Sequence, residues 1–144
     1  MLPLTLASRA LNACERISVC AGSDGPGRRI ARYRIGTPRH LEFEYPDSSN
    51  ASPIRWARTG YSGGGELQYR FINSGHEYII YSSVTRDGLD RQHRPIPRFD
   101  AGVLVRREGR ILSHLHCDNA EDAARGYEEP SDFMLEGEFI FWRV

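Results

Sequence analysis

The feature that most constrains the fold of this chain is a series of short segments in which apolar and polar residues alternate. The clearest is residues 40–45, HLEFEY, where Leu41, Phe43 and Tyr45 would share one face. A period of two places successive side chains on opposite faces of a strand, so such a run predicts a half-buried β-strand. The same character is found in residues 15–20, 28–35, 54–58, 66–71, 76–83, 101–107, 111–117 and 138–144.

Turn residues separate these runs. Residues 24–27, 63–65, 73–75 and 108–110 all contain glycine, which favours tight turns between antiparallel neighbours. The sequence therefore predicts an all-β fold: a single antiparallel meander that closes into a barrel or a strongly curled sheet. One short helix is expected near residues 119–127, where Asn119 can cap it.

The alternation also predicts which side chains are buried. For residues 66–71 the inner face would carry Leu67, Tyr69 and Phe71, and the outer face Glu66, Gln68 and Arg70. An exception to regular structure is residues 85–100, TRDGLDRQHRPIPRFD, which we expect to form one long loop. Irregular loops of this length in compact domains are often functional, although a solvated excursion is the alternative.

At 144 residues the chain has the size of one domain, which we place at residues 15–144. Residues 1–14 resemble an export-signal remnant, or else form an N-terminal extension, and Cys14 follows small residues as in a lipidation site. The three cysteines cannot all pair within one chain. Cys20 and Cys117 lie in an early and a late strand-like run, so we expect them to form a disulfide in an oxidising compartment. Buried thiols are the alternative.

The charges exclude some classes of function. Nineteen basic residues, all of them arginine, balance nineteen acidic ones. Zero net charge argues against binding to nucleic acid, which requires a basic surface. No apolar run approaches the roughly 18 residues that a membrane span requires.

One short stretch carries a motif. Ser74, Gly75 and Tyr78 give the pattern S-G-x-x-Y, and Tyr81, Thr85, Arg86 and Gly88 follow it. This resembles the signatures of the bacterial periplasmic and membrane-bound lysozyme inhibitors, which are small exported β-barrels, often lipoproteins and often disulfide-linked. The resemblance implies a turn that presents Ser74 to the catalytic carboxylates of a lysozyme, with Tyr78 supporting the turn. Read without it, residues 73–75 are an ordinary hairpin turn.

We therefore expect an exported bacterial protein, periplasmic or secreted, with no cofactor and no catalytic residues of its own. It would bind and inhibit a protein partner, either a lysozyme-like cell-wall hydrolase or an antibacterial toxin for which it is the immunity protein. The predicted contact residues are Ser74, Gly75, His76, Tyr78, Arg86, Arg91, His93 and Arg94.

Two other functions remain open from the sequence. Alternation places His114, His116 and Asp118 on one face of a strand, which suits a metal-binding or hydrolytic enzyme, although an exposed polar face explains the same pattern. A small-ligand-binding β-barrel is the third possibility and requires an apolar interior cavity.

Overall fold

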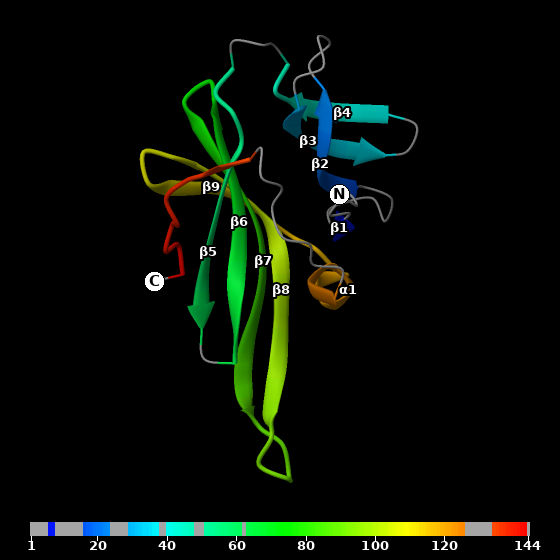
Figure 1. Ribbon diagram of the computed structural model, residues 1–144, viewed down its shortest axis with the longest axis vertical. Coiled ribbons are helices and arrows are strands. Elements are labelled where there is room, and N and C mark those ends of the chain that lie inside the picture. The colour runs from blue at the N-terminus through cyan, green and yellow to red at the C-terminus, as the bar shows by residue number, and fades with distance from the viewer. Residues whose placement is uncertain are drawn as a thin grey trace.

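The computed structural model describes residues 6–7, 16–23, 29–37, 40–47, 51–61, 63–125 and 134–143. Strands dominate this part of the chain and form two sheets (Figure 1). The small sheet has the order β1 (Leu6–Ala7), β2 (Arg16–Ser23), β3 (Arg29–Thr37), β4 (His40–Tyr45). The large sheet has the order β10 (Leu135–Glu136), β5 (Arg55–Tyr61), β6 (Gly64–Asn73), β7 (His76–Leu89), β8 (Pro95–Arg107), β9 (Arg110–His116).

The predicted all-β class is confirmed, and so is the short helix, α1 (Ala120–Arg125). Every pairing among β5 to β9 is antiparallel between sequence neighbours, as the short turns required, and only β10 runs parallel to its neighbour β5. No described helix has the length and apolar character needed to cross a membrane. The predictions for the start of the chain, including a lipid anchor at Cys14, fall mainly outside the described residues.

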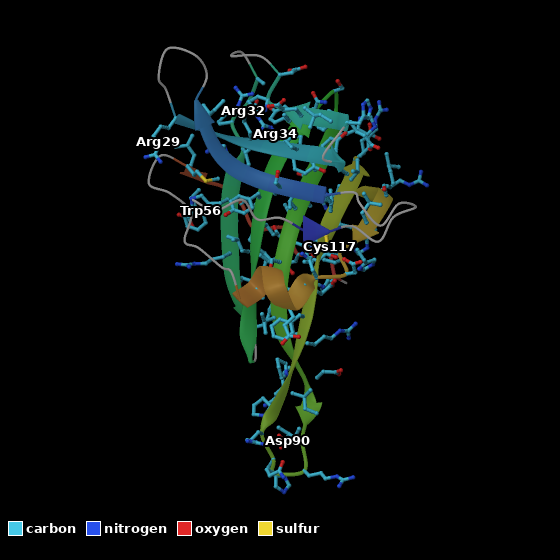
Figure 2. All side chains as sticks on the ribbon, turned by 90° about the vertical axis from the view of Figure 1, so that its right-hand side faces the viewer. Arg29, Arg32, Arg34, Trp56, Asp90 and Cys117 are labelled. Atoms are coloured by element: carbon cyan, nitrogen blue, oxygen red, sulfur yellow. The ribbon has the colours of Figure 1, made fainter. Side chains whose placement is uncertain are left out.

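The prediction of one meander that closes into a barrel or a strongly curled sheet is wrong in its second half. Within the described residues no ladder joins the small sheet to the large one, and no closure is found. Instead β2 and β3 cross one face of the large sheet (Figure 2). Each sheet buries its apolar face against the other, which removes apolar surface from water without the strands having to continue around a barrel.

The core between the sheets is rich in aromatic rings. Phe71 on β6 stacks on Tyr45 with ring centroids 4.0 Å apart and on Tyr78 with centroids 4.7 Å apart. Tyr33 from β3 approaches Phe71 at 5.4 Å and is 2% exposed. Each such pair contributes about 0.5–1.5 kcal/mol beyond the area that it buries. Leu67, Tyr69 and Phe71 are all buried on this face, as the alternation predicted.

The opposite face of the large sheet is also covered, so the prediction that Glu66 and Gln68 face solvent is wrong: they are 2% and 0% exposed. Residues 137–143, which we call the C-terminal strap, lie across this face. Ile140 and Trp142 of the strap pack on a buried apolar cluster, which consists of Ile79, Tyr81 and Leu104. The expected last strand at residues 138–144 is not a strand in its described part, 138–143, because it lies on the sheet face and not at an edge.

The prediction of a long loop at residues 85–100 is also wrong. β7 continues to Leu89 and β8 begins at Pro95, so only residues 90–94 lie outside regular structure. Among the described residues, β6 pairs with β7 only as far as Val84, and β9 pairs with β8 only from Gly102. Residues 85–98 therefore form a two-stranded ribbon, the β7–β8 arm, that projects beyond the rest of the sheet (Figures 1 and 2).

Candidate functional site

Three residue pairs join the two strands of the β7–β8 arm. Thr85 pairs with Arg98, Arg86 with Pro97, and Leu89 with Pro95. Residues 87–88 form a bulge between these pairs, with Gly88 at a φ of 82°. A bulge of this kind needs one residue in the left-handed region, which glycine adopts without steric penalty, and it increases the twist of the ribbon.

Side-chain hydrogen bonds hold the tip of the arm, where Figure 2 labels Asp90. One carboxylate oxygen of Asp90, Oδ1, accepts from the backbone amides of Gln92 and Arg94, both at 2.9 Å. The other oxygen, Oδ2, accepts from Arg94 Nε at 3.0 Å. The backbone amide of Arg94 is the main group that lowers the pKa of Asp90, and the Gln92 amide and the Arg94 side chain lower it further. The tip is therefore ordered by its own residues, although residues 91–94 are exposed and Asp90 is partly exposed.

The arm is positive, partly apolar and closed to strand addition along one edge. Its residues include four arginines against two aspartates. Leu89 and Ile96 are 51% and 41% exposed. Pro95 and Pro97 lack amide hydrogens, so the β8 edge of the arm is a poor template for a further strand. On that edge, side chains and not the backbone are left to make contacts.

The structure does not bring the predicted contact residues together. Ser74 and Gly75 alone connect β6 to β7, with φ values of 52° and 76° as in a type I′ turn, and His76 Nδ1 lies 3.1 Å from the Ser74 carbonyl oxygen. This turn is at the opposite end of the 14-residue strand β7 from the arm. At about 3.3 Å per residue the separation along the strand is roughly 40 Å. Tyr78 lies in the aromatic core.

The other four predicted contact residues do share one surface. Arg86, Arg91, His93 and Arg94 all lie in the arm and are exposed. Gly63, in the turn between β5 and β6, fits closely against Arg86: a Cβ added there would lie 2.9 Å from the Arg86 Cβ. This close approach lies at the base of the arm, where the pairing of β6 with β7 ends.

The predicted Cys20–Cys117 disulfide is not formed, because Cys117 is a free thiol. Its sulfur occupies the core between the sheets, where cysteine packs as a small apolar residue. Burial, followed by the charges of Asp118 and Asp100, raises the pKa of the Cys117 thiol to about 12. The side chain of Cys20 and all of Cys14 lie outside the described residues.

The histidines proposed as metal ligands take part in a different arrangement. The rings of His114 and His116 lie 3.9 Å apart, as adjacent positions on one face of β9 predicted. His114 Nε2 is 2.6 Å from the Tyr81 hydroxyl, and His116 Nδ1 is 3.4 Å from Asp100 Oδ1. In the described part of the chain no three His, Cys, Asp or Glu residues are placed to hold a metal ion, so Asp118 does not complete a site with them.

A charged cluster beneath the strap was not predicted from the sequence. Arg143 bridges two carboxylates: Nη1 pairs with Glu66 Oε1, and Nη2 lies 2.7 Å from Asp100 Oδ2. The same Nη2 donates to Ser83 Oγ at 3.1 Å. Trp142 Nε1 donates to Glu66 Oε2 at 3.2 Å, and the guanidinium lies 4.1 Å from the Trp142 ring centroid. We call Glu66, Ser83, Asp100 and Arg143 the polar node.

The pKa shifts around the polar node are those of a fixed ion pair. Burial alone would raise the pKa of Asp100, but the hydrogen bond and charge of Arg143, followed by His116, lower it overall. Burial, followed by the charge of Asp100, raises the pKa of Tyr81 far above its usual range. Burial and the charge of His116 lower the pKa of His114. At neutral pH the tyrosine is therefore protonated, the aspartate charged and His114 neutral, an arrangement that anchors the strap.

A cavity of about 310 Å³ lies between α1 and the large sheet, and its apolar lining includes Leu67, Val84 and Ala124. It is a surface hollow beside a helix and not the interior of a barrel, so it does not match the expected ligand-binding barrel. Comparison with protein-family models, with curated proteins and with solved structures gave no significant match.

Proposed function

We propose that this protein is a non-enzymatic binding protein whose β7–β8 arm enters an acidic cleft of a partner protein and blocks it. One observation carries the proposal: the arm is ordered to its tip although no described strand lies beside it. Isolated two-stranded hairpins are marginally stable in water, yet Asp90 fastens this one. A projection that is ordered before binding loses little conformational entropy when it binds.

The side chains of the arm indicate the chemistry of the partner. Arginine forms bidentate pairs with carboxylates, and Arg86, Arg91 and Arg98 are exposed along the arm. Leu89 and Ile96 add exposed apolar contact area beside these charges. The complementary surface is a cleft that carries carboxylates on apolar walls.

Glycan hydrolases have such a cleft, since two carboxylic acids flank the bond that they break. A lysozyme-like cell-wall hydrolase is therefore the first candidate partner, and an antibacterial toxin the second. In either case the chain would act as an exported inhibitor or immunity protein. The S-G-x-x-Y turn contributes nothing to this proposal, because it lies at the other end of β7.

The test is inhibition and binding of muramidases from several structural classes, measured by enzyme assay and calorimetry. The triple variant Arg86→Glu/Arg91→Glu/Arg98→Glu should weaken binding by roughly 100-fold, because each change replaces an attraction to a carboxylate with a repulsion. The control Arg107→Glu/Arg110→Glu changes exposed arginines at the far end of the same sheet and should leave binding within about two-fold.

One result would narrow the proposal and another would refute it. Failure of the wild type to inhibit any muramidase class would remove the hydrolase and leave a toxin as the protein partner to be tested. If no protein partner is found and the arm instead binds duplex DNA, the target of its arginines is the phosphate backbone and not a protein cleft.

A further inference from the structure

The Gly137 amide donates to the Trp56 carbonyl oxygen of β5 at 2.7 Å, and beyond this residue the C-terminal strap crosses the large sheet without forming a ladder with any described strand. It leaves β10 at Gly137, where a Cβ would lie 2.9 Å from the Arg55 Cβ, so the backbone passes close over that side chain. The Glu138 carbonyl oxygen then accepts from Arg70 Nη1 at 2.9 Å. Further on, Ile140 exchanges two hydrogen bonds with the side chain of Gln68. Side chains of the sheet therefore hold the backbone of the strap.

The inner and outer sides of the strap differ. Ile140 and Trp142 face the sheet and pack on its buried apolar cluster. Phe141 is 70% exposed, and its ring lies 4.9 Å from that of Phe139. Because no ladder hydrogen bond joins residues 138–143 to the sheet, the strap can leave the face without breaking a strand pair. Segments attached in this way open at a lower free energy than the strands beneath them.

Arg143, at the end of the strap, is surrounded by titratable side chains of the sheet. The titratable and charged groups around Arg143 come from every strand of this face, namely Tyr61 on β5, Glu66 on β6, Tyr81 on β7, Asp100 on β8 and both His114 and His116 on β9. Arg143 is the cation that the strap supplies to the two carboxylates. Trp142 covers His114 edge-on, with ring centroids 5.2 Å apart.

We infer that the C-terminal strap is a latch that acid releases: protonation of the groups around Arg143 frees residues 138–143 from the sheet while both sheets stay folded. Release would expose the apolar cluster of the large sheet, which the strap covers at neutral pH. The two carboxylates of the polar node would be uncovered with it.

The sign of the effect is the same for both titrating groups. The pKa of His114 is lowered while the strap is docked, so protonation of this imidazole, from about its ordinary pKa of 6.5 downward, favours the released form. The pKa of Asp100 is also lowered by docking. The charged Asp100 carboxylate therefore stabilises the docked strap above its ordinary pKa, and this stabilisation is lost as pH falls through the pKa that Asp100 has in the docked form. Release should begin with His114 and be completed with Asp100.

Fluorine NMR of the full chain labelled with 5-fluorotryptophan tests this directly. The chain has two tryptophans: Trp142 in the strap, and Trp56 on the other face of the large sheet, where its Nε1 donates to the Met134 carbonyl oxygen. Between about pH 7.5 and about pH 3 we expect the Trp142 resonance to move to its solvent-exposed position while the Trp56 resonance and the far-ultraviolet circular dichroism stay unchanged.

Three variants give the inference its controls. Arg143→Gln should show the released Trp142 resonance already at neutral pH, and His114→Gln should lower the midpoint of release by about one pH unit. Arg94→Gln, in the arm, should leave the midpoint unchanged. A Trp142 resonance that stays in place down to about pH 3 would overturn the inference, and so would a simultaneous change of both tryptophans, which indicates global unfolding.

Discussion

The side-chain amide of Gln68 completes both backbone hydrogen bonds of Ile140. Gln68 Nε2 donates to the Ile140 carbonyl oxygen at 2.9 Å, and the Ile140 amide donates to Gln68 Oε1 at 3.0 Å. Gln68 is fully buried, and its Nε2 also lies 2.6 Å from Glu66 Oε2. The Gln68 side chain therefore supplies the donor and the acceptor that the backbone of a neighbouring strand would supply in a sheet.

Replacing Gln68 should be costly. Gln68→Ala leaves the Ile140 amide and carbonyl without their partner and opens space beneath the strap, so we expect a loss of about 3 kcal/mol in the free energy of unfolding. Urea denaturation followed by circular dichroism measures it. Gln92→Ala, at the exposed tip of the arm, is the matched control and should change the unfolding free energy by less than about 0.5 kcal/mol. Equal effects of the two changes would contradict the buried role of Gln68.

The S-G-x-x-Y turn should matter for stability and not for binding. Gly75 has a φ of 76°, which penalises any residue with a Cβ, so Gly75→Ala should destabilise the fold by about 1 kcal/mol. Ser74→Ala, next to it, should leave stability and arm-dependent binding unchanged. A Ser74→Ala variant that loses inhibition of a muramidase would restore the turn as the contact surface.

Cys117 should resist alkylation in the native protein. Burial raises the pKa of this thiol to about 12, so its reactive thiolate is scarce at pH 8 and the sulfur is inaccessible. Iodoacetamide should therefore modify Cys117 only after denaturation, with no reductant present, as peptide mass spectrometry would show. If denatured protein needs a reductant before Cys117 reacts, the thiol is oxidised and the disulfide prediction is reinstated.

The tip of the arm should depend on one carboxylate. Asp90→Ala removes the acceptor for the Gln92 and Arg94 amides, so we expect faster amide hydrogen exchange at residues 91–94 and no change in the exchange of the core strands. Asp87→Ala, in the bulge of the same arm, is the control. Unchanged exchange at the tip in Asp90→Ala would mean that the ribbon is ordered by something other than this carboxylate.

Acid stability should report on Asp100. Its folded pKa is lowered, so the stabilisation that it provides is present above its ordinary pKa of 3.8 and is lost as pH falls through the folded value. The difference in unfolding free energy between wild type and Asp100→Asn should therefore be largest near neutral pH and shrink below about pH 3.8. A difference that is constant with pH would show that Asp100 is not charged in the folded protein.

Strand positions could be predicted from this sequence because alternation is a local signal. Residues 40–45 were predicted as a strand and are β4, and the inner face of β6 carries the predicted Leu67, Tyr69 and Phe71. The burial of Glu66 and Gln68 could not be predicted, because the strap that covers them lies some 70 residues away along the chain. The sequence did contain one signal for this covering segment. Ile140 and Trp142 alternate with other residues, and such alternation indicates that one side of the segment packs against an apolar surface.

The arm was missed for a related reason. A strand is recognised by one buried face, and residues 85–98 have none, so their sequence shows no period and contains two prolines that normally argue against a strand. Four of the predicted contact residues nevertheless lie in that segment: Arg86, Arg91, His93 and Arg94. Their separation from Ser74 depends on the length of β7, which the sequence alone did not define.

The polar node and the arm share a pair of residues. Ser83 and Asp100 face each other across β7 and β8, one position before Val84 pairs with Phe99, where the neighbouring strands end and the ribbon leaves the sheet. Arg143 touches both. The strap is therefore anchored to the pair of residues at which the arm leaves the sheet, and its release would remove a side-chain contact from the base of the arm.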